Sequence, residues 1–425
     1  MFLRRSTGVL GAVLLLSILA TGASLWLVLH PDFSRDRFLR DHEPAPPVAT
    51  HPLWMFEAER RGAILATPFA WENRLLVAAA HDSAFQNAGA VYCLNRTDGR
   101  LIWRFDADGK MQHTYSSPCV SGGRVFIGEG MHANFLCKLY CLDADTGRKR
   151  WDFTANGHIE SSPRVEAGRV FFAAGDDGVY CLDAVTGSKH WQVVGGFHSD
   201  SSPAVADGRV YFGTGTSRLH KTTEAWCVEA GTGKVVWRVP TDLPAWGAPL
   251  ASGDVVFFGL GNGRLLTDPP DPQRPAGGVL CLDAATGQRR WYYDAGNAVF
   301  GQPAVDDGRL YLACRGGQAH ALDRLSGQPL WKVPVGSPVV TAPALSVAGL
   351  VVLGSSGEVH GLDPRDGRTR WTWHVGQHYR MTASLVSSPL VMEDADEGRR
   401  IYFGAELSNP AGNAAVVFCL GDPGP

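Results

Sequence analysis

Short apolar runs alternate with tight polar turns along most of the chain. In residues 179–191, an apolar run is followed by Asp183, Thr186 and Gly187, and a second run ends at Trp191. An Asp, Thr and Gly cluster between two β-prone runs predicts a hairpin, because glycine accepts a positive φ and the polar side chains hydrogen-bond the turn backbone. The pattern therefore predicts antiparallel strands, and the repeated segments have no convincing helical period.

This Cys-Leu-Asp-x-x-Thr-Gly phrase, or a degenerate copy of it, occurs seven times, and a tryptophan follows its first residue by ten positions in every copy. A second hairpin lies upstream of each phrase, often with an Asp-Gly turn such as Asp207-Gly208, so each unit contains four short strands. The tryptophans are spaced by 40 to 54 residues, which predicts the blades of a β-propeller. The phrases begin at Cys93, Cys141, Cys181, Cys227, Cys281, Ala321 and Gly361, and the tryptophans are Trp103, Trp151, Trp191, Trp237, Trp291, Trp331 and Trp371.

The two ends of the repeat region complement each other. An eighth phrase begins at Cys419 without a following tryptophan, whereas Trp54 has no phrase before it. We therefore expect residues 51–59 to supply the missing outer strand and close the ring, since closure removes two exposed sheet edges. The expected fold is all-β, an eight-bladed propeller of four-stranded antiparallel blades spanning 51–425. The blades are expected at about 62–103, 111–151, 156–191, 196–237, 243–291, 297–331, 336–371 and 380–420.

The recurring tryptophans, Trp54 included, are expected to have a structural role. At one position on each outer strand, the ring can wedge between neighbouring blades while its indole N–H donates to a backbone carbonyl. The alternative is a set of stacking residues for carbohydrate or nucleic acid, but positions shared by every repeat are usually packing positions.

The pattern Leu-Asp-x-x-Thr-Gly-x-x-x-x-Trp, preceded by Ser-Ser-Pro-x-Val and Asp-Gly-x-Val-Tyr-Phe-Gly, resembles the pyrroloquinoline-quinone-type (PQQ-like) propeller repeat. The resemblance covers about residues 51 to 420. It implies one of two functions. Quinoprotein dehydrogenases bind the quinone and Ca²⁺ on the propeller axis, whereas non-catalytic members, such as the outer-membrane assembly factor, are protein-binding scaffolds. The repeat predicts the fold and does not choose between these functions.

The net charge bears on nucleic-acid binding, and the positions of the cysteines bear on disulfide formation. The formal net charge of the 425 residues is −3, and Lys and Arg form no cluster, so an electrostatic nucleic-acid site is not expected. Six of the nine cysteines occupy the same slot in different blades and cannot meet at disulfide distance. The sequence leaves open a pairing among the remaining three, Cys119, Cys137 and Cys314.

The N-terminal residues predict a membrane anchor. Residues 1–30 begin with a short basic segment, and the stretch 8–29 is apolar and long enough to span a bilayer as a transmembrane helix. A cleaved signal is the alternative, but the apolar run is longer than a usual signal core. Residues 31–50 contain four prolines and read as a linker. We expect the propeller in the periplasm or another extracytoplasmic space.

The blades differ in length mainly at the connection between their second and third strands. In a propeller these loops emerge on the same rim as the links between blades, and insertions confined to one face indicate a binding face. A protein or peptide partner is therefore expected on this loop-rich rim. The enlarged loops are 80–89, 128–138, 213–225, 260–278 and 405–414.

A histidine stands five residues before the repeat proline in three successive blades. These residues are His113, His158 and His198, and two positions later come Tyr115, Glu160 and Asp200. Imidazoles beside carboxylates can bind Zn²⁺ or another divalent transition metal, which makes His113, His158, His198, Glu160 and Asp200 candidate ligands. The alternative is a hydrogen-bonded network that ties adjacent blades together. His81, His132 and His378 could join from the same rim.

A quinone site has weaker support in this sequence. Trp246 is the only tryptophan of the loop-rich rim that could stack on a flat cofactor, and the chain has no pair of adjacent cysteines. The preferred hypothesis is a membrane-anchored scaffold that needs no cofactor. The alternative is an oxidoreductase that uses PQQ with calcium, or a divalent transition metal, at the mouth of the axial channel.

Overall fold

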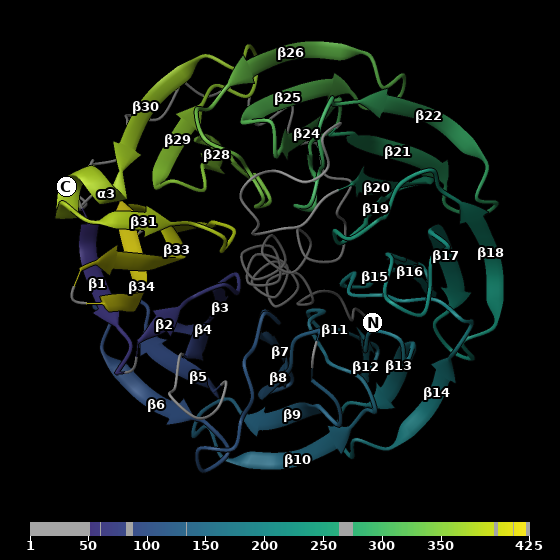
Figure 1. Cartoon of the computed structure of the whole chain (residues 1–425), viewed down its shortest axis with the longest axis horizontal. Coiled ribbons are helices and arrows are strands. Elements are labelled where there is room, and N and C mark those ends of the chain that lie inside the picture. The colour runs from purple at the N-terminus through teal and green to yellow at the C-terminus, as the bar shows by residue number, and fades with distance from the viewer. Residues whose placement is uncertain are drawn as a thin grey trace, which may run out of the picture.

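Each four-strand repeat forms a twisted sheet in which every strand pairs with its neighbour in the sequence. In the third blade, the strands β11 (Arg164–Glu166), β12 (Arg169–Ala173), β13 (Val179–Asp183) and β14 (Lys189–Val193) pair antiparallel in that order. Figure 1 shows β11 near the centre of the ring and β14 at its circumference. The Asp-x-x-Thr-Gly phrase connects the third strand to this outer strand, as the sequence predicts.

The computed structural model describes residues 52–59, 61–81, 88–132, 134–262, 275–394, 398–410 and 412–421. These residues form eight antiparallel sheets arranged around one axis (Figure 1). The predicted eight-bladed, all-β propeller is therefore confirmed. The predicted anchor and linker, residues 1–50, lie outside the described residues. The described part of the chain includes no helix with the length and hydrophobicity of a membrane span.

The other six complete blades follow the same order, although the innermost strand of the first blade is divided in two. The first two blades comprise β2 (Gly62–Ala63), β3 (Phe69–Trp71), β4 (Arg74–His81), β5 (Ala88–Asn95) and β6 (Leu101–Phe105), then β7 (Cys119–Ser121), β8 (Arg124–Gly128), β9 (Lys138–Asp143) and β10 (Lys149–Thr154). The fourth and fifth comprise β15 (Ala204–Ala206), β16 (Arg209–Gly213), β17 (Glu224–Glu229) and β18 (Val235–Pro240), then β19 (Leu250–Ser252), β20 (Val255–Gly261), β21 (Gly277–Asp283) and β22 (Arg289–Asp294). The sixth and seventh comprise β23 (Ala304–Val305), β24 (Arg309–Cys314), β25 (Gln318–Asp323) and β26 (Pro329–Pro334), then β27 (Ala344–Ser346), β28 (Gly349–Leu353), β29 (Glu358–Leu362) and β30 (Thr369–His374).

The eighth blade joins the two ends of the described chain. Its inner strands are β31 (Thr382–Ser384) and β32 (Leu390–Asp394), which both pair with β33 (Gly398–Asn409), and β33 pairs with β34 (Gly412–Gly421). The outer strand is β1 (Pro52–Glu57), which pairs with β34 so that Trp54 lies opposite Cys419. Trp191 lies opposite Cys181 in the same way within the third blade. The strand of the orphan tryptophan thus completes the ring.

Seven of the eight outer-strand tryptophans, all except Trp371, pack against the turn glycine of the next blade. The Trp103 indole N–H donates to the Ala144 carbonyl at 3.0 Å, and five further tryptophans make the equivalent bond. The turn glycine lies beneath the ring: a Cβ on Gly147, whose φ is +68°, would stand 2.5 Å from Trp103. The Trp151 indole N–H is buried without a hydrogen-bond partner. The recurring phrase therefore couples a left-handed glycine to a tryptophan of the preceding blade.

A second set of contacts joins the blades near the axis. In the Ser-Ser-Pro segments, the hydroxyl of the second serine accepts from the backbone N–H at the equivalent position of the preceding blade. Ser162 Oγ accepts from Ser117 N at 2.9 Å, and Ser202 Oγ accepts from Ser162 N at 2.8 Å. The first serine ties the segment to its own blade, since Ser161 Oγ donates to the Ala173 carbonyl at 2.8 Å. These bonds fix the position of the links between blades, which lead into the Ser-Ser-Pro segments.

The hydrophobic core lies between adjacent blades, in separate clusters. In one of them, Phe171 and Trp191 of the third blade pack with Phe212 and Trp226 of the fourth. All nine cysteines are free, so the pairing left open among Cys119, Cys137 and Cys314 does not occur. A short helix, α3 (Val375–Tyr379), was not predicted; it begins after the N-cap His374 and ends at Arg380, which has a φ of +54°.

Candidate metal centre

Two links between blades carry the central residues of the candidate site. His158 and Glu160 lie between β10 and β11, whereas His198 and Asp200 lie between β14 and β15. Both links are followed by the serines that join the blades, and His198 forms a β-bridge with Gly215 of the next blade. His198 contacts Asp200 directly, and His158 and Glu160 both contact the ring of His132, so each histidine and its carboxylate face the same region.

Asp200 is the centre of the cluster. Its Oδ1 lies 2.9 Å from His158 Nε2, and its Oδ2 lies 2.8 Å from His198 Nε2. The side chains of His158, His198 and Asp200 are all at least nine-tenths buried. Since a carboxylate only accepts hydrogen bonds when it is ionised, both imidazoles direct an N–H at Asp200. The structure therefore brings together three of the predicted residues.

A third imidazole ring enters from the enlarged loop between β8 and β9. His132 Nδ1 lies 2.6 Å from Glu160 Oε1, and its Nε2 lies 3.4 Å from Asp200 Oδ2. The ring stacks on His158 with centroids 5.1 Å apart and planes inclined by 13°. Its side chain remains 61% exposed, so the cluster opens to solvent on this side. The sequence indicated His132 only as a residue that could join from the same rim.

Asp176, which the sequence pattern did not indicate, holds the far side of His198. Asp176 Oδ1 lies 2.8 Å from His198 Nδ1 and 4.0 Å from His220 Nε2. It stands in the minimal loop between β12 and β13, where a polar turn residue gives no sign of a functional role. The only available signal was that this loop opens on the same rim as the histidines.

The electrostatics of the cluster follow from these contacts. Burial opposes ionisation of Asp200, but hydrogen bonds from His158 and His198 hold the pKa of its carboxyl well below the usual range. The hydrogen bond to Glu160 raises the pKa of His132 to about 9, with burial opposing and the charge of Asp200 adding to the effect. Burial lowers the pKa of His198, but its bonds to Asp200 and Asp176 outweigh burial and raise it. These shifts keep the Asp200 carboxyl ionised and favour the protonated rings of His132 and His198.

The ring contacts of His113 lie outside this group. Its Nε2 lies 2.7 Å from the His81 carbonyl and its Nδ1 lies 3.1 Å from Met131 Sδ. Both ring nitrogens therefore have neighbours within the first two blades. His81 lies 3.0 Å from the Tyr92 hydroxyl through its Nε2, and the ring of His378 lies against Trp373. The regular sequence spacing of the three histidines thus does not bring all three rings together.

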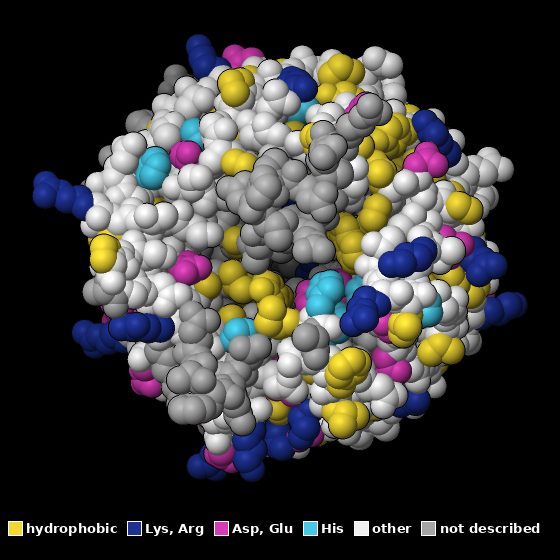
Figure 2. Space-filling view, viewed as in Figure 1, with side chains coloured by type: hydrophobic (Ala, Val, Ile, Leu, Met, Phe, Trp, Pro, Cys, Tyr) yellow, Lys and Arg dark blue, Asp and Glu magenta, His cyan; other side chains and the backbone are white. Residues whose placement is uncertain are grey.

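Trp246 lies beside the cluster and belongs to an apolar group. Its ring meets His198 edge-on with centroids 6.0 Å apart, and a Cβ on Gly215 would stand 2.0 Å from the indole. On its other side it packs with Phe300 and Val340. Figure 2 shows histidine and acidic side chains gathered near the centre of this face, beside hydrophobic ones. Apolar side chains therefore border the histidine cluster on the side of Trp246.

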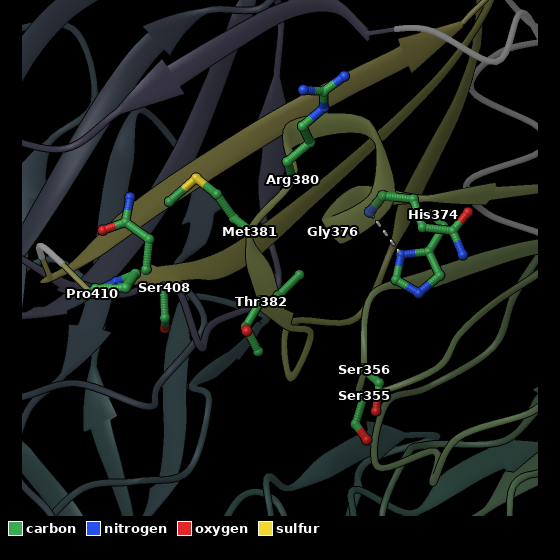
Figure 3. Close-up of a pocket in the computed structure, with 12 residues that line it drawn as sticks. Ser355, Ser356, His374, Gly376, Arg380, Met381, Thr382, Ser408 and Pro410 are labelled. Carbon is green, nitrogen blue, oxygen red and sulfur yellow. Dashed lines mark hydrogen bonds between the residues drawn. The ribbon is translucent and has the colours of Figure 1, made fainter.

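A separate hollow of about 520 Å³ lies between α3 and the hairpin of β33 and β34 (Figure 3). His374 is engaged there as the N-cap of α3, where its Nδ1 accepts from Gln377 N at 3.3 Å. The lining residues include no carboxylate and therefore do not combine acid and base groups as the histidine cluster does. They are Ser355, Ser356, His374, Gly376, Gln377, Arg380, Met381, Thr382, Ala383, Ser408, Asn409 and Pro410.

The chemistry of the cluster suits some cofactors and not others. Imidazole nitrogen and carboxylate oxygen are the donors that Zn²⁺ and similar transition metals prefer. Calcium takes six to eight oxygen ligands, and a group in which His132, His158 and His198 surround one carboxylate does not fit it. The residues at this site therefore do not fit the calcium ion that the dehydrogenase branch of the PQQ-like resemblance implies.

Comparison with known proteins gives one family and several similar folds. The family model described as outer membrane protein assembly factor BamB matches residues 15–132, 137–222, 198–267 and 275–417. Among curated proteins, the β-alanine-activating enzyme of Danio rerio is 28% identical over 109 residues. That match covers 25% of this chain and only 8% of the relative.

Solved structures share the fold at low sequence identity. BamB from Moraxella catarrhalis has a TM-score of 0.61 at 15% identity, covering 88% of this chain and 97% of that one. The quinohemoprotein alcohol dehydrogenase from Comamonas testosteroni has a TM-score of 0.66 at 14% identity, covering 88% and 77% respectively. A europium-containing methanol dehydrogenase has a TM-score of 0.66 at 12% identity, covering 88% and 93%. These likenesses extend to BamB and to dehydrogenases alike and establish the fold alone.

Proposed function

The chain belongs to the family of the outer membrane protein assembly factor BamB, and from this premise we propose that it is a non-catalytic, protein-binding scaffold of the cell envelope. The proposed binding surface is the loop-rich face of the second, third and fourth blades. The proposed location is extracytoplasmic, with residues 1–30 as the membrane anchor and residues 31–50 as the linker. The propeller supplies a rigid ring, and its longer loops supply the surface that differs from blade to blade.

One observation carries this proposal. Four large apolar side chains on the loop-rich face of these three blades are between 63% and 76% exposed, namely Phe135, Leu136, Val194 and Leu219. Phe135 and Leu136 stand on the loop between β8 and β9, and Leu219 stands on the loop between β16 and β17. Large exposed apolar side chains on the loops and links of three adjacent blades support a surface that another molecule covers. Aromatic and aliphatic anchors of this kind contribute much of the affinity in protein interfaces.

The test compares two faces of the same ring. Phe135→Ser with Leu219→Ser removes two anchors from the loop-rich face, whereas Val185→Ser with Leu325→Ser removes two exposed apolar residues from the turns of the opposite rim. Partners recovered from envelope extract with the full chain would be identified by mass spectrometry and titrated by calorimetry. We expect the first double variant to weaken binding by about tenfold or more and the second by less than about twofold. Equal losses would contradict the proposed surface.

The alternative proposal is a quinone- or metal-dependent oxidoreductase. Its support is the fold shared with the alcohol and methanol dehydrogenases and the position of Trp246 beside the histidine cluster. It is less well supported because the donor set does not fit calcium. An ultraviolet–visible titration of the purified chain with PQQ and Ca²⁺ separates the two functions: a stoichiometric spectral change that Trp246→Ala abolishes would favour the enzyme.

A further inference from the structure

We propose that His132, His158 and Asp200 bind a divalent transition metal, with Zn²⁺ as the best match to the donors. One ligand atom from each of the three residues lies within 4.8 Å of the other two. His158 Nε2 and His132 Nε2 lie 2.9 and 3.4 Å from the two oxygens of Asp200. Ligands bound to one zinc ion at about 2.0–2.2 Å stand at comparable separations, so small side-chain movements suffice to admit the ion.

The second ring nitrogen of His132 supports this assignment. Nδ1 faces Glu160 Oε1 at 2.6 Å, and a carboxylate in that position fixes the proton on Nδ1. In the neutral ring, Nε2 then carries the lone pair and points toward Asp200. Metal-binding histidines commonly have their other nitrogen held by a carboxylate in this way, which orients the ring and strengthens the ligand.

His198 and Asp176 complete the support for Asp200. His198 Nε2 lies 2.8 Å from Asp200 Oδ2, and its Nδ1 lies 2.8 Å from Asp176 Oδ1. With a carboxylate at each nitrogen and a side chain only 2% exposed, His198 is a positioning residue that holds the Asp200 carboxylate. The three protein ligands leave a coordination position for water on the side where His132 meets solvent.

The competing explanation is a structural network without a metal. The same hydrogen bonds join the second, third and fourth blades and would stabilise the rim by themselves. The two explanations differ in one property: a network alone takes up no ion. Metal binding is also separable from the protein-binding proposal, because its ligands differ from the apolar residues that the binding test alters.

The experiment measures metal uptake directly. The purified full chain is stripped with a chelator, equilibrated with Zn²⁺ or Co²⁺, and analysed by mass spectrometry for bound metal and by absorption for the Co²⁺ ligand-field bands. We expect one ion per chain in the unaltered protein. His158→Gln and His132→Gln are expected to weaken binding by at least about 100-fold, and Glu160→Gln by about tenfold because it alters only an outer contact.

His113→Gln is the matched control, since it removes a histidine at the equivalent position of the adjacent blade without touching the cluster. It is expected to retain one ion. His132→Gln guards against misfolding because that side chain is largely exposed, and circular dichroism of each variant checks the fold. Absence of stoichiometric Zn²⁺ or Co²⁺ in the unaltered chain would overturn the proposal, as would equal affinities of folded His132→Gln and His113→Gln.

Discussion

Buried ionisable side chains occupy two opposite environments in this propeller. Asp200 is surrounded by imidazoles that keep it ionised, whereas His320 is fully buried and kept neutral. His320 Nδ1 lies 2.8 Å from the Tyr293 hydroxyl, and its Nε2 lies 3.7 Å from Cys314 Sγ. Burial first, and the charge of Lys332 second, lower the pKa of His320 to about 4. The cost of charging a buried side chain thus depends on the partners around it.

The lowered pKa of His320 predicts acid sensitivity. Between its unfolded pKa of about 6.5 and its folded pKa of about 4, the unfolded chain binds a proton that the folded chain does not. The free energy of unfolding therefore falls as pH decreases through this window, by on the order of 3 kcal/mol from this residue. We expect His320→Gln to flatten the pH dependence of urea unfolding between pH 7 and 4.5. A parallel decline in the variant and the unaltered protein would contradict this.

His190→Gln is the control for that measurement. His190 stands on β14, and its side chain is 38% exposed near Asp183. Because this side chain is partly exposed and not enclosed in the core as His320 is, its replacement is expected to leave the pH dependence unchanged.

At the scale of the element, the Asp-x-x-Thr-Gly turn forms both a hairpin and a contact between blades. Asp143 Oδ1 accepts from Thr146 N at 2.9 Å and from its hydroxyl at 2.8 Å, which closes the turn. Gly147 then takes a positive φ and leaves room for the Trp103 ring of the preceding blade. The turn sequence is therefore repeated for two reasons: it closes the hairpin, and its glycine leaves room for the tryptophan of the preceding blade.

A matched pair of glycines separates the two roles of this turn. Gly147 and Gly208 have φ values of +68° and +70°, but a Cβ on Gly208 would meet nothing within 4 Å. We expect Gly208→Ala to cost about 1 kcal/mol from backbone strain. Gly147→Ala should cost about 2–4 kcal/mol because it also displaces the tryptophan ring. Urea denaturation of both variants measures the difference, and equal costs would show that the ring adjusts freely.

At the scale of the whole molecule, closure of the ring depends on β1. Trp54 on this strand donates its indole N–H to the Arg96 carbonyl of the first blade at 3.1 Å, and its ring lies 5.9 Å from that of Tyr402. The strand therefore joins the eighth blade to the first through both its backbone and its tryptophan. Without it, the apolar strand β34 would present an unpaired edge.

We expect Trp54→Ala to lower the free energy of unfolding by about 2–3 kcal/mol and to speed cleavage near β1 in limited proteolysis. Met55→Ala is the control, because Met55 is the next residue on the strand and is 42% exposed. It is expected to cost less than about 1 kcal/mol. If the two substitutions had the same effect, Trp54 would not contribute to closure of the ring by β1.

The repeat is the part of this molecule that the sequence predicted best. Strand number, blade number and the pairing of Trp54 with the last blade follow from a pattern repeated at fixed internal spacing, because every copy meets the same packing requirement. The helix α3 was missed because five residues are too few to display a helical period. A repeated pattern predicts the features that its copies share, and it does not predict a feature found in one blade only.

The candidate site was predicted in part, through His158, His198, Glu160 and Asp200, because these residues stand at equivalent positions of adjacent blades. The sequence by itself thus determined the fold and the rim on which these side chains lie. Only the tertiary structure decided that His113 turns to the His81 carbonyl while His132 and Asp176 enter from loops. The physical reason is that repeat spacing places a backbone position, whereas the direction of a side chain and the path of a loop depend on contacts unique to one blade.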